Sequence, residues 1–140
     1  MSSPGELRSS NFQDRIHTLT QTGCYFVAVE NELPVGHVLL DPMGLSALAH
    51  VFRLTIVVHP GQRGRGVGTA LMRSALGWAE DDQRVRKIEL LVRATNHNAI
   101  RLYRKLGFLE EGRLREHVRL PSGRFVDDIA MAWFPKRLGT

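Results

Sequence analysis

The sequence predicts an α/β protein in which helices pack on a mixed β-sheet. Two observations predict this class. Apolar stretches with the two-residue alternation of β-strands are interspersed with stretches that have helical spacing. In addition, a glycine-rich loop joins a mostly buried strand to a helix. The chain has 140 residues, so we expect a single domain spanning 1–140.

The first half of the chain is expected to be mainly β-structure. Residues 6–22 are weakly patterned, and we predict a helix there. CYFVAVE (24–30) is rich in β-branched and aromatic residues, and the turn sequence NELP separates it from VGHVLLD (35–41), which predicts a β-hairpin. After a loop at 42–49, HVFRLTIVV (50–58) is predicted to be a mostly buried strand.

The second half is expected to alternate helices and strands. Apolar residues recur at helical spacing from 67 to about 82, and KIELLVR (87–93) alternates as a strand does. NHNAIRLYRKLGF (96–108) predicts a helix that is capped by Asn96 and ends at Gly107. The segments RLREHVRL and RFVDDIAMAW, joined by PSG, predict a final hairpin.

Composition restricts the environment and the partners. The chain has one cysteine, no apolar run near the ~18 residues that span a bilayer, and no signal-peptide core at its start, so we expect a cytoplasmic protein without membrane contact. The net charge of +5 favours nucleic acid or an anionic cofactor or substrate as partner. The basic segments at 84–87 and 113–119 contain no interleaved aromatic residues, which favours a solvated surface. The six histidines lack metal-ligand spacing, so we expect no metal.

The loop HPGQRGRGVGTALM (59–72) has the features of an anion-binding site. Its glycines expose backbone N–H groups at the start of a helix, and Arg63 and Arg65 add positive charge. The loop is not a Walker A motif, because Val67 stands where that motif requires lysine. It also departs from the dinucleotide fingerprint, because Thr69 occupies the third glycine position. A glycine-rich connection without a ligand is the alternative.

Two motifs, in the expected order and spacing, resemble those of the GNAT N-acetyltransferases. The segment from Arg63 to Gly68 matches the family's R-x-x-G-x-G motif, and NHNAIRLYRKLGF is similar to its second signature, N-x-x-A-x-x-L-Y-x-x-x-G-F. The resemblance covers roughly residues 25–133 and implies a mixed, splayed sheet flanked by helices.

The N-terminus departs from the family pattern. Family members usually begin with a strand and one or two helices, whereas only 23 residues precede Cys24. We therefore expect the usual first strand to be missing from the shortened segment 1–23. A wrongly assigned start codon is the alternative.

The resemblance implies acetyl-coenzyme A (acetyl-CoA) as donor and a primary amine as acceptor. Backbone amides of the loop would hold the pyrophosphate, main-chain groups of the preceding strand would pair with the pantetheine arm, and an asparagine would contact the cofactor from the other side. The implied cofactor-binding residues are Ile56, Val57, Val58, Arg63, Gly64, Arg65, Gly66, Val67, Gly68, Thr69, Asn96 and Asn98. Each asparagine has helix capping as an alternative role.

Tyr103 falls on the family's proton donor to the departing thiolate, which makes it the catalytic residue that the resemblance implies. A core tyrosine is the alternative.

The general base stays unassigned, because the strand before the loop has no carboxylate. His50 at the start of that strand is either a base or a polar strand end. Strand alternation places Asp127 on the apolar face of its strand. We expect it to form an ion pair with an arginine of the adjacent strand, such as Arg115, in preference to an ion pair with a substrate amine. Cys24 has no activating neighbour, so we expect a small strand residue and no acyl-enzyme.

We therefore expect an N-acetyltransferase that works by direct attack of the amine of an amino acid, a polyamine, or a protein or peptide N-terminus. Two alternatives remain. One is an acetyltransferase acting on aminoacyl-tRNA, which the basic charge would suit. The other is an acyl-CoA-binding module without turnover. A homodimer would form if an uncovered sheet edge paired across a two-fold axis.

Overall fold

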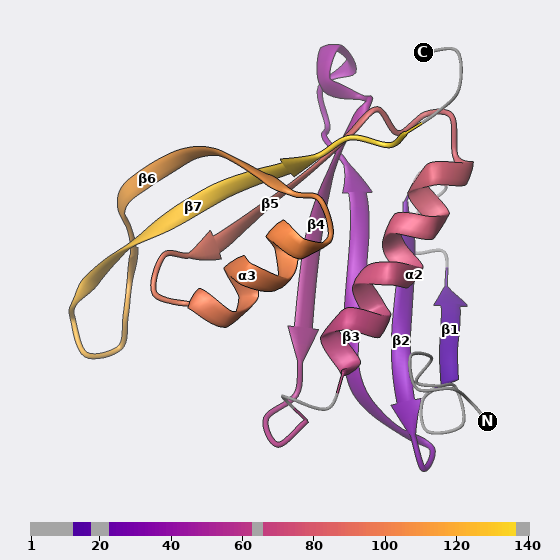
Figure 1. Cartoon of the computed structure of the whole chain (residues 1–140), viewed down its shortest axis with the longest axis horizontal. Helices are drawn as coiled ribbons and strands as arrows, with labels where there is room; N and C mark the ends of the chain where they lie inside the picture. Colours follow the sequence, from indigo (N-terminus) through magenta and orange to yellow (C-terminus); the bar gives the residue numbers. More distant parts are fainter. Residues whose placement is uncertain (1–12, 18–22, 63–65, 137–140) are drawn as a thin grey trace.

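The computed structural model describes residues 13–17 by their backbone and residues 23–62 and 66–136 in full. These residues form a mixed seven-stranded sheet in the order β1-β2-β3-β4-β5-β7-β6 (Figure 1). The strands are β1 (Gln13–His17), β2 (Cys24–Glu30), β3 (Leu33–Pro42), β4 (Val51–Val58), β5 (Lys87–Arg93), β6 (Leu109–Arg119) and β7 (Phe125–Trp133). The helices are α2 (Val67–Asp81) and α3 (His97–Lys105), and the 3₁₀ turn η2 (Ser46–Leu48) precedes β4. The predicted α/β class is confirmed.

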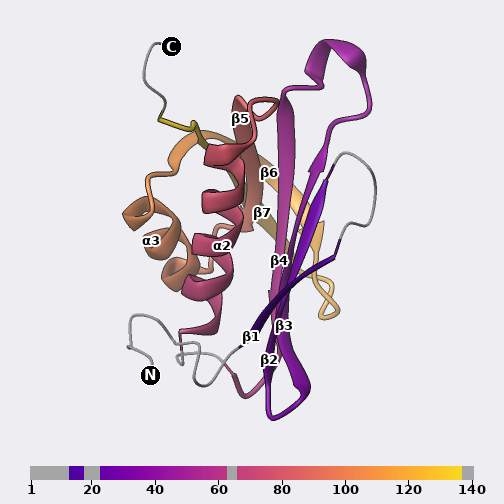
Figure 2. The same cartoon turned by 90° about the vertical axis from the view of Figure 1, so that its right-hand side faces the viewer.

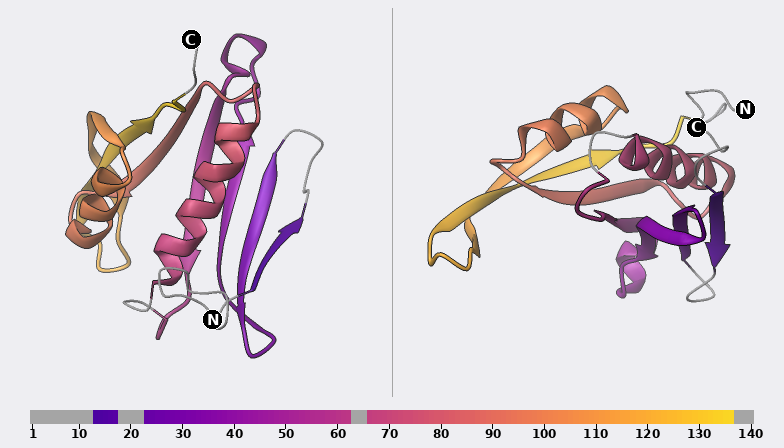
Figure 3. Two further views of the ribbon diagram at one scale, coloured as in Figure 1. Left: turned by 45° about the vertical axis from the view of Figure 1, so that its right-hand side comes forward. Right: turned by 90° about the horizontal axis from the view of Figure 1, so that it is seen from below.

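Both helices lie on the same face of the sheet (Figures 2 and 3). Helix α2 packs on β2, β3 and β4. The core fills the space between the helices and the sheet, and its largest fully buried side chains include Phe52, Phe108, Leu40, Leu71, Met72, Ile88 and Met131. Removing this apolar layer from water is the main source of stability for the fold. Among the described residues, no helix is long and apolar enough to cross a membrane.

An N-terminal strand is present, which corrects two predictions. Residues 13–17 form β1 instead of part of a helix over 6–22, and the first strand is therefore not missing; the rest of 6–22 lies outside the described residues. β1 pairs antiparallel with residues 25–29 of β2. Without this pairing, one side of β2 would be a sheet edge with unpaired N–H and C=O groups. The helix prediction failed because a non-local partner, not local patterning, decides the conformation of such an edge strand.

The β2–β3 hairpin confirms the turn predicted at NELP. Asn31 and Glu32 have φ angles of 54° and 67°. A type I′ turn requires positive φ at both central residues, and its twist matches that of the two strands it joins. The final hairpin, β6–β7, is also confirmed, although β6 begins at Leu109, before the predicted segment. Figure 1 shows this hairpin reaching beyond the part of the sheet that α2 covers.

The parallel strands β4 and β5 separate after a short paired stretch. Residues 51–53 pair with residues 87–89, and the pairing ends there. β4 continues to Val58 and β5 to Arg93 without further bonds between them. Figure 1 shows the two strands diverging, with α3 beside the opening. The sheet is therefore splayed, as the resemblance implied.

Candidate active site

The N-terminus of α2 presents backbone donors at the end of the glycine loop. The first hydrogen bond of the helix runs from the Ala70 N–H to the Gly66 carbonyl (3.0 Å), so the N–H groups of Val67, Gly68 and Thr69 have no partner within the helix. No described side chain caps this end, and Gly66 has a φ of 83°. The donors and the helix dipole together favour an anion here. The predicted loop residues that lie outside the described part of the chain are Arg63, Gly64 and Arg65.

The backbone of β4 presents further donors and acceptors to the opening. The His59 N–H donates to the Val35 carbonyl (3.0 Å), which sets the phase of the antiparallel β3–β4 ladder. Alternate residues of such a ladder bond to the partner strand. Val57 therefore bonds to β3, whereas the N–H and C=O groups of Ile56 and Val58 point away from β3, towards the opening.

The end of α3 positions Tyr103. Gly107 has a φ of 107°, its N–H donates to the Arg104 carbonyl (3.0 Å), and the Phe108 N–H donates to the Tyr103 carbonyl (2.9 Å). These two bonds form a Schellman motif, which confirms the predicted glycine at the helix end. The motif places the Phe108 ring against Tyr103 with centroids 5.9 Å apart, and Phe108 packs in turn on Trp133.

Gly107→Ala is expected to lower the free energy of unfolding by about 1–2 kcal/mol, because an L-residue with a Cβ is disfavoured in the left-handed region. The new Cβ would also lie 3.3 Å from Cδ1 of Trp133. Urea denaturation measures the change. Gly123→Ala is the matched control, because Gly123 has a φ of 92° but open space around its Cβ position. Equal losses in the two variants would show that the contact with Trp133 adds nothing.

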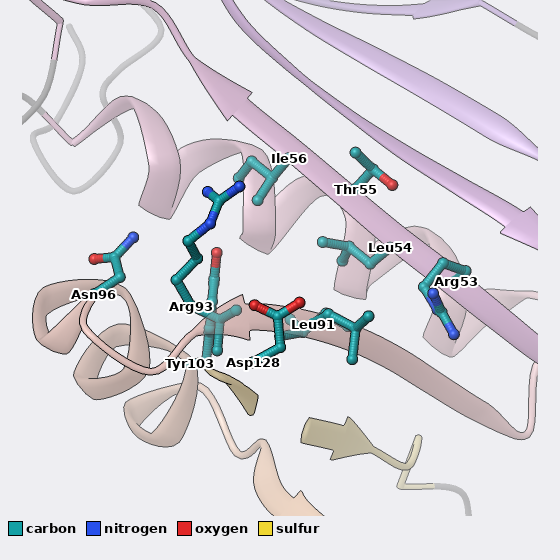
Figure 4. Close-up of a pocket in the computed structure, with 11 residues that line it drawn as sticks. Arg53, Leu54, Thr55, Ile56, Leu91, Arg93, Asn96, Tyr103 and Asp128 are labelled. Carbon is teal, nitrogen blue, oxygen red and sulfur yellow. The ribbon is translucent and has the colours of Figure 1, made fainter. Parts of the chain in front are cut away.

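A pocket of about 410 Å³ lies where β4 and β5 separate (Figure 4). It is lined by residues 53–56 of β4, residues 90–93 of β5, the helix cap Asn96, Tyr103 of α3 and Asp128 of β7. The fold thus brings together side chains from four elements that span residues 53 to 128 of the sequence.

Tyr103 is a core residue that also lines the pocket. It is 8% exposed. Burial raises the pKa of Tyr103 above its usual value near 10, so the phenol keeps its proton at neutral pH. The structure has no hydrogen bond from this hydroxyl to another described residue. The hydroxyl can therefore donate to a group in the pocket without breaking an internal bond.

The two predicted asparagines lie at different surfaces. The Asn96 side chain accepts a hydrogen bond from the Ala99 N–H (3.1 Å), which confirms it as the cap of α3, and Asn96 also lines the pocket. Asn98 is exposed, is bonded to Arg101, and borders a shallow hollow on the other side of α3, together with Leu102. The structure brings Asn96, and not Asn98, together with Tyr103.

Asp128 is a pocket residue that sequence reasoning missed. The strand pattern singled out Asp127, but Asp128 is the buried one, at 6% exposure. Asp127 forms the expected ion pair with an arginine of the adjacent strand, which is Arg113 (Nε to Oδ2, 2.6 Å) and not Arg115. It also accepts a hydrogen bond from the Glu116 N–H (2.8 Å). That bond, and then the Arg113 guanidinium, lower the pKa of Asp127 below its usual range. Glu116 lies within the register shift between Leu114 and Val118 of β6, and the alternation of β7 alone does not contain this information.

The other titratable candidates lie away from the pocket. His50 is exposed just before β4 and does not line the pocket. Within the described ranges, no group of histidine, cysteine and carboxylate side chains could hold a metal ion.

Cys24 is expected to resist thiol reagents in the folded protein. Its side chain is 3% exposed, and burial raises the pKa of the thiol to about 12, so almost no thiolate exists at pH 8. Titration with 5,5′-dithiobis(2-nitrobenzoic acid) should detect the chain's single thiol only after denaturant is added. Rapid reaction of the native protein would contradict the burial of Cys24.

Three features define the class of this site, an α/β fold with an opened sheet. They are the separated parallel strands β4 and β5, the glycine-led helix after β4 and the buried tyrosine on the helix after β5. The particular family follows from comparison with known proteins. The model of the acetyltransferase (GNAT) family matches residues 2–108, so the chain belongs to this family.

Individual relatives agree with this membership. The chain is 37% identical over 98 residues to the L-amino acid N-acetyltransferase AaaT of Escherichia coli (strain K12), covering 70% of this chain and 60% of that protein. It is 32% identical over 93 residues to the spermidine N(1)-acetyltransferase of the same organism, covering 64% of this chain and 50% of that protein. The acetyltransferase of GNAT family from Streptococcus pneumoniae superposes with a TM-score of 0.78 at 26% identity, covering 83% of this chain and 69% of that one. The chain thus spans about half to 60% of the length of these two sequence relatives.

Proposed function

We propose that this chain is an N-acetyltransferase that transfers the acetyl group of acetyl-CoA to a primary amine. The observation that carries the proposal is the opening between β4 and β5, which has backbone donors along one side and the side chain of Tyr103 at its pocket. Membership of the GNAT family supports the same activity. We propose further that residues 1–140 work as one acetyltransferase domain.

In this proposal the donor lies along β4, with its pyrophosphate at the N-terminus of α2. The N–H groups of residues 67–69 are oriented for this, and loop residues 63–66 add backbone donors and two arginines. The pantetheine arm pairs with the backbone of Ile56 and Val58 as a neighbouring strand would. Asn96 contacts the cofactor from the α3 side, and the exposed Asn98 contacts it further from the reacting centre.

The reaction requires a neutral amine, a polarised thioester carbonyl and a proton for the departing thiolate. Tyr103 supplies that proton in this proposal. An alkyl thiol has a pKa of about 8.5 and a phenol one of about 10, so full transfer from Tyr103 to sulfur is mildly uphill in water. A strong hydrogen bond from the hydroxyl nevertheless stabilises the negative charge that develops on sulfur in the transition state.

The test measures binding and turnover separately. Calorimetry with acetyl-CoA is expected to show binding, and incubation with acetyl-CoA and a panel of amino acids, polyamines and short peptides is expected to release free thiol. Binding without thiol release for any amine would identify an acyl-CoA-binding module instead. Absence of binding would contradict the assignment of the loop and of β4.

A further inference from the structure

Asp128 is a mostly buried residue whose carboxylate has no partner among the residues that the structure describes in full. It is 6% exposed and lines the pocket, and no residue that the structure describes in full donates a hydrogen bond or forms an ion pair with it. A carboxylate in a mostly buried position has lost much of its hydration, so an unpaired carboxylate that lines a pocket favours a cationic ligand. The neighbouring Asp127 differs, because Arg113 and the Glu116 N–H already satisfy it.

The strand pairing places Asp128 on the face of the sheet opposite the helices. Arg53 and Glu89 are register partners in the β4–β5 pairing, and Nη2 of Arg53 lies 3.3 Å from Oε1 of Glu89. These two side chains therefore share a face. Glu89 and Arg93 share that face because side chains alternate along a strand. Arg93 lies directly opposite Asp128 in the β5–β7 ladder, and opposed residues share a face. Arg53, Arg93 and Asp128 therefore project on one side.

The core side of the same strands carries Leu54, Leu90 and Ile129, which pack under the helices. Tyr103 belongs to this core and reaches the pocket from the helix side. A donor that lies beside α2 and α3 would therefore meet the Tyr103 hydroxyl on one face, while an acceptor would meet Asp128 from the other face.

The two arginines of the pocket are placed to bind an anion next to a cation held by Asp128. The Arg93 side chain makes no ion pair or hydrogen bond with a side chain that the structure describes. In Figure 4 its guanidinium extends past the Tyr103 hydroxyl towards Ile56 and does not turn to Asp128. Arg53 is held by Glu89, yet its Nε is buried and has no acceptor among the described residues. The pocket thus offers one unpaired carboxylate and unused guanidinium donors.

We propose that the acceptor is a free α-amino acid, whose ammonium is held by Asp128 and whose carboxylate is held by Arg93, with Arg53 nearby. This inference rests on the proposed acetyltransferase function. Arg93 and Asp128 are directly opposed in the β5–β7 ladder, so one small ligand with both charges can reach the two side chains. A polyamine has no anion for the arginines and adds cations next to them, and the N-terminus of a polypeptide has an amide where the carboxylate is needed.

The chemistry balances with the groups in the pocket. Asp128 takes one proton from the ammonium, and the amine nitrogen then forms a C–N bond with the thioester carbonyl carbon. As the C–S bond breaks, Tyr103 gives its proton to sulfur, and the second proton of the nitrogen returns to the Tyr103 oxygen. Asp128 releases its proton to solvent, so the products are the N-acetyl amino acid, the free thiol and one proton.

The first test compares each free amino acid with its own amide, which keeps the amine and the side chain but removes the carboxylate. Thiol release from acetyl-CoA gives kcat/KM for each member of the twenty pairs, with spermidine and dipeptides as further acceptors. We expect at least one free amino acid to exceed its amide, spermidine and the dipeptides by about ten-fold or more, because only the free acid offers a carboxylate to the guanidinium of Arg93.

Substitutions test which residues cause the preference for the free acid over its amide. Arg93→Met is expected to bring the ratio of acid to amide close to one, whereas Asp128→Asn is expected to lower kcat/KM for acid and amide alike. The matched controls are Arg124→Met and Asp127→Asn, which remove the same charges outside the pocket and should keep the parent ratio. Acetyl-CoA affinity, measured by calorimetry, should stay at the parent value in all four variants.

The outcomes separate this inference from the proposed function. Failure to bind acetyl-CoA would overturn the proposed function itself. Turnover in which amides, spermidine or dipeptides equal or exceed the free acids would leave the acetyltransferase standing and overturn the amino acid as acceptor. An unchanged acid-to-amide ratio in Arg93→Met would do the same, and binding of acetyl-CoA with no turnover of any acceptor would overturn both.

Discussion

Tyr103→Phe is expected to lower kcat by about 10²-fold while folding and acetyl-CoA binding stay unchanged. The substitution keeps the ring, and therefore the packing against Phe108 at a centroid distance of 5.9 Å. It removes only the hydroxyl, which bonds to no other described residue, so the native fold loses no internal hydrogen bond. The loss should therefore fall on the step in which charge develops on sulfur.

Single-turnover thiol release and calorimetry with acetyl-CoA measure the two quantities separately. Tyr25→Phe is the matched control, because Tyr25 is the chain's other tyrosine and lies on β2, away from the opening. A folded Tyr103→Phe protein that turned over at the parent rate would show that the proton comes from water or another group.

The pH dependence follows from the same residue. Burial raises the pKa of Tyr103, so the proton is present below its usual value near 10 and is lost only as pH rises through the higher, folded-state value. Ionisation of Tyr103 should therefore cause no fall in kcat between pH 7 and about pH 10. A loss of kcat in that range in the parent, absent from Tyr103→Phe, would contradict the raised pKa.

Gly66→Val is expected to weaken acetyl-CoA binding by at least ten-fold, which corresponds to about 1.4 kcal/mol. Gly66 has a φ of 83°, a conformation that a β-branched residue strongly disfavours, and it immediately precedes the helix N-terminus assigned to the pyrophosphate. Gly68→Val should also weaken binding, for a different reason. A Cβ there makes ordinary contacts, 3.6 Å from Cγ2 of Val58, so obstruction of the ligand outweighs backbone strain.

Gly77→Val is the matched control for both substitutions. Gly77 also lies in α2, but a Cβ at this position meets open space, and the residue is far along the helix from its N-terminus. Calorimetry with acetyl-CoA and circular dichroism distinguish lost binding from lost folding. Unchanged affinity in a folded Gly66→Val protein would remove the phosphate-binding role from the loop.

Local sequence signals determined most of the elements. The two-residue alternation of residues 87–93 and the helical spacing after Val67 correspond to β5 and α2. Asn96 and Gly107 marked both ends of α3, because a cap and a left-handed stop are requirements of a few adjacent residues. The spacing of the two motifs was also sufficient to indicate the family, since both motifs lie within local segments.

The tertiary structure decided what depends on distant partners. β1 is formed by pairing with the edge of β2. The weak pattern of residues 13–17 did not reveal this pairing. The opening between β4 and β5 depends on where their pairing ends, and no single strand encodes that position. Asp128 lines the pocket because it lies opposite Arg93 of β5. The side chain of Asp127, in contrast, is bonded to Arg113 and Glu116 of β6. The sequence alone thus determined most of the elements and the two motifs, whereas only the packing of strands far apart in the chain decided which carboxylate lines the pocket.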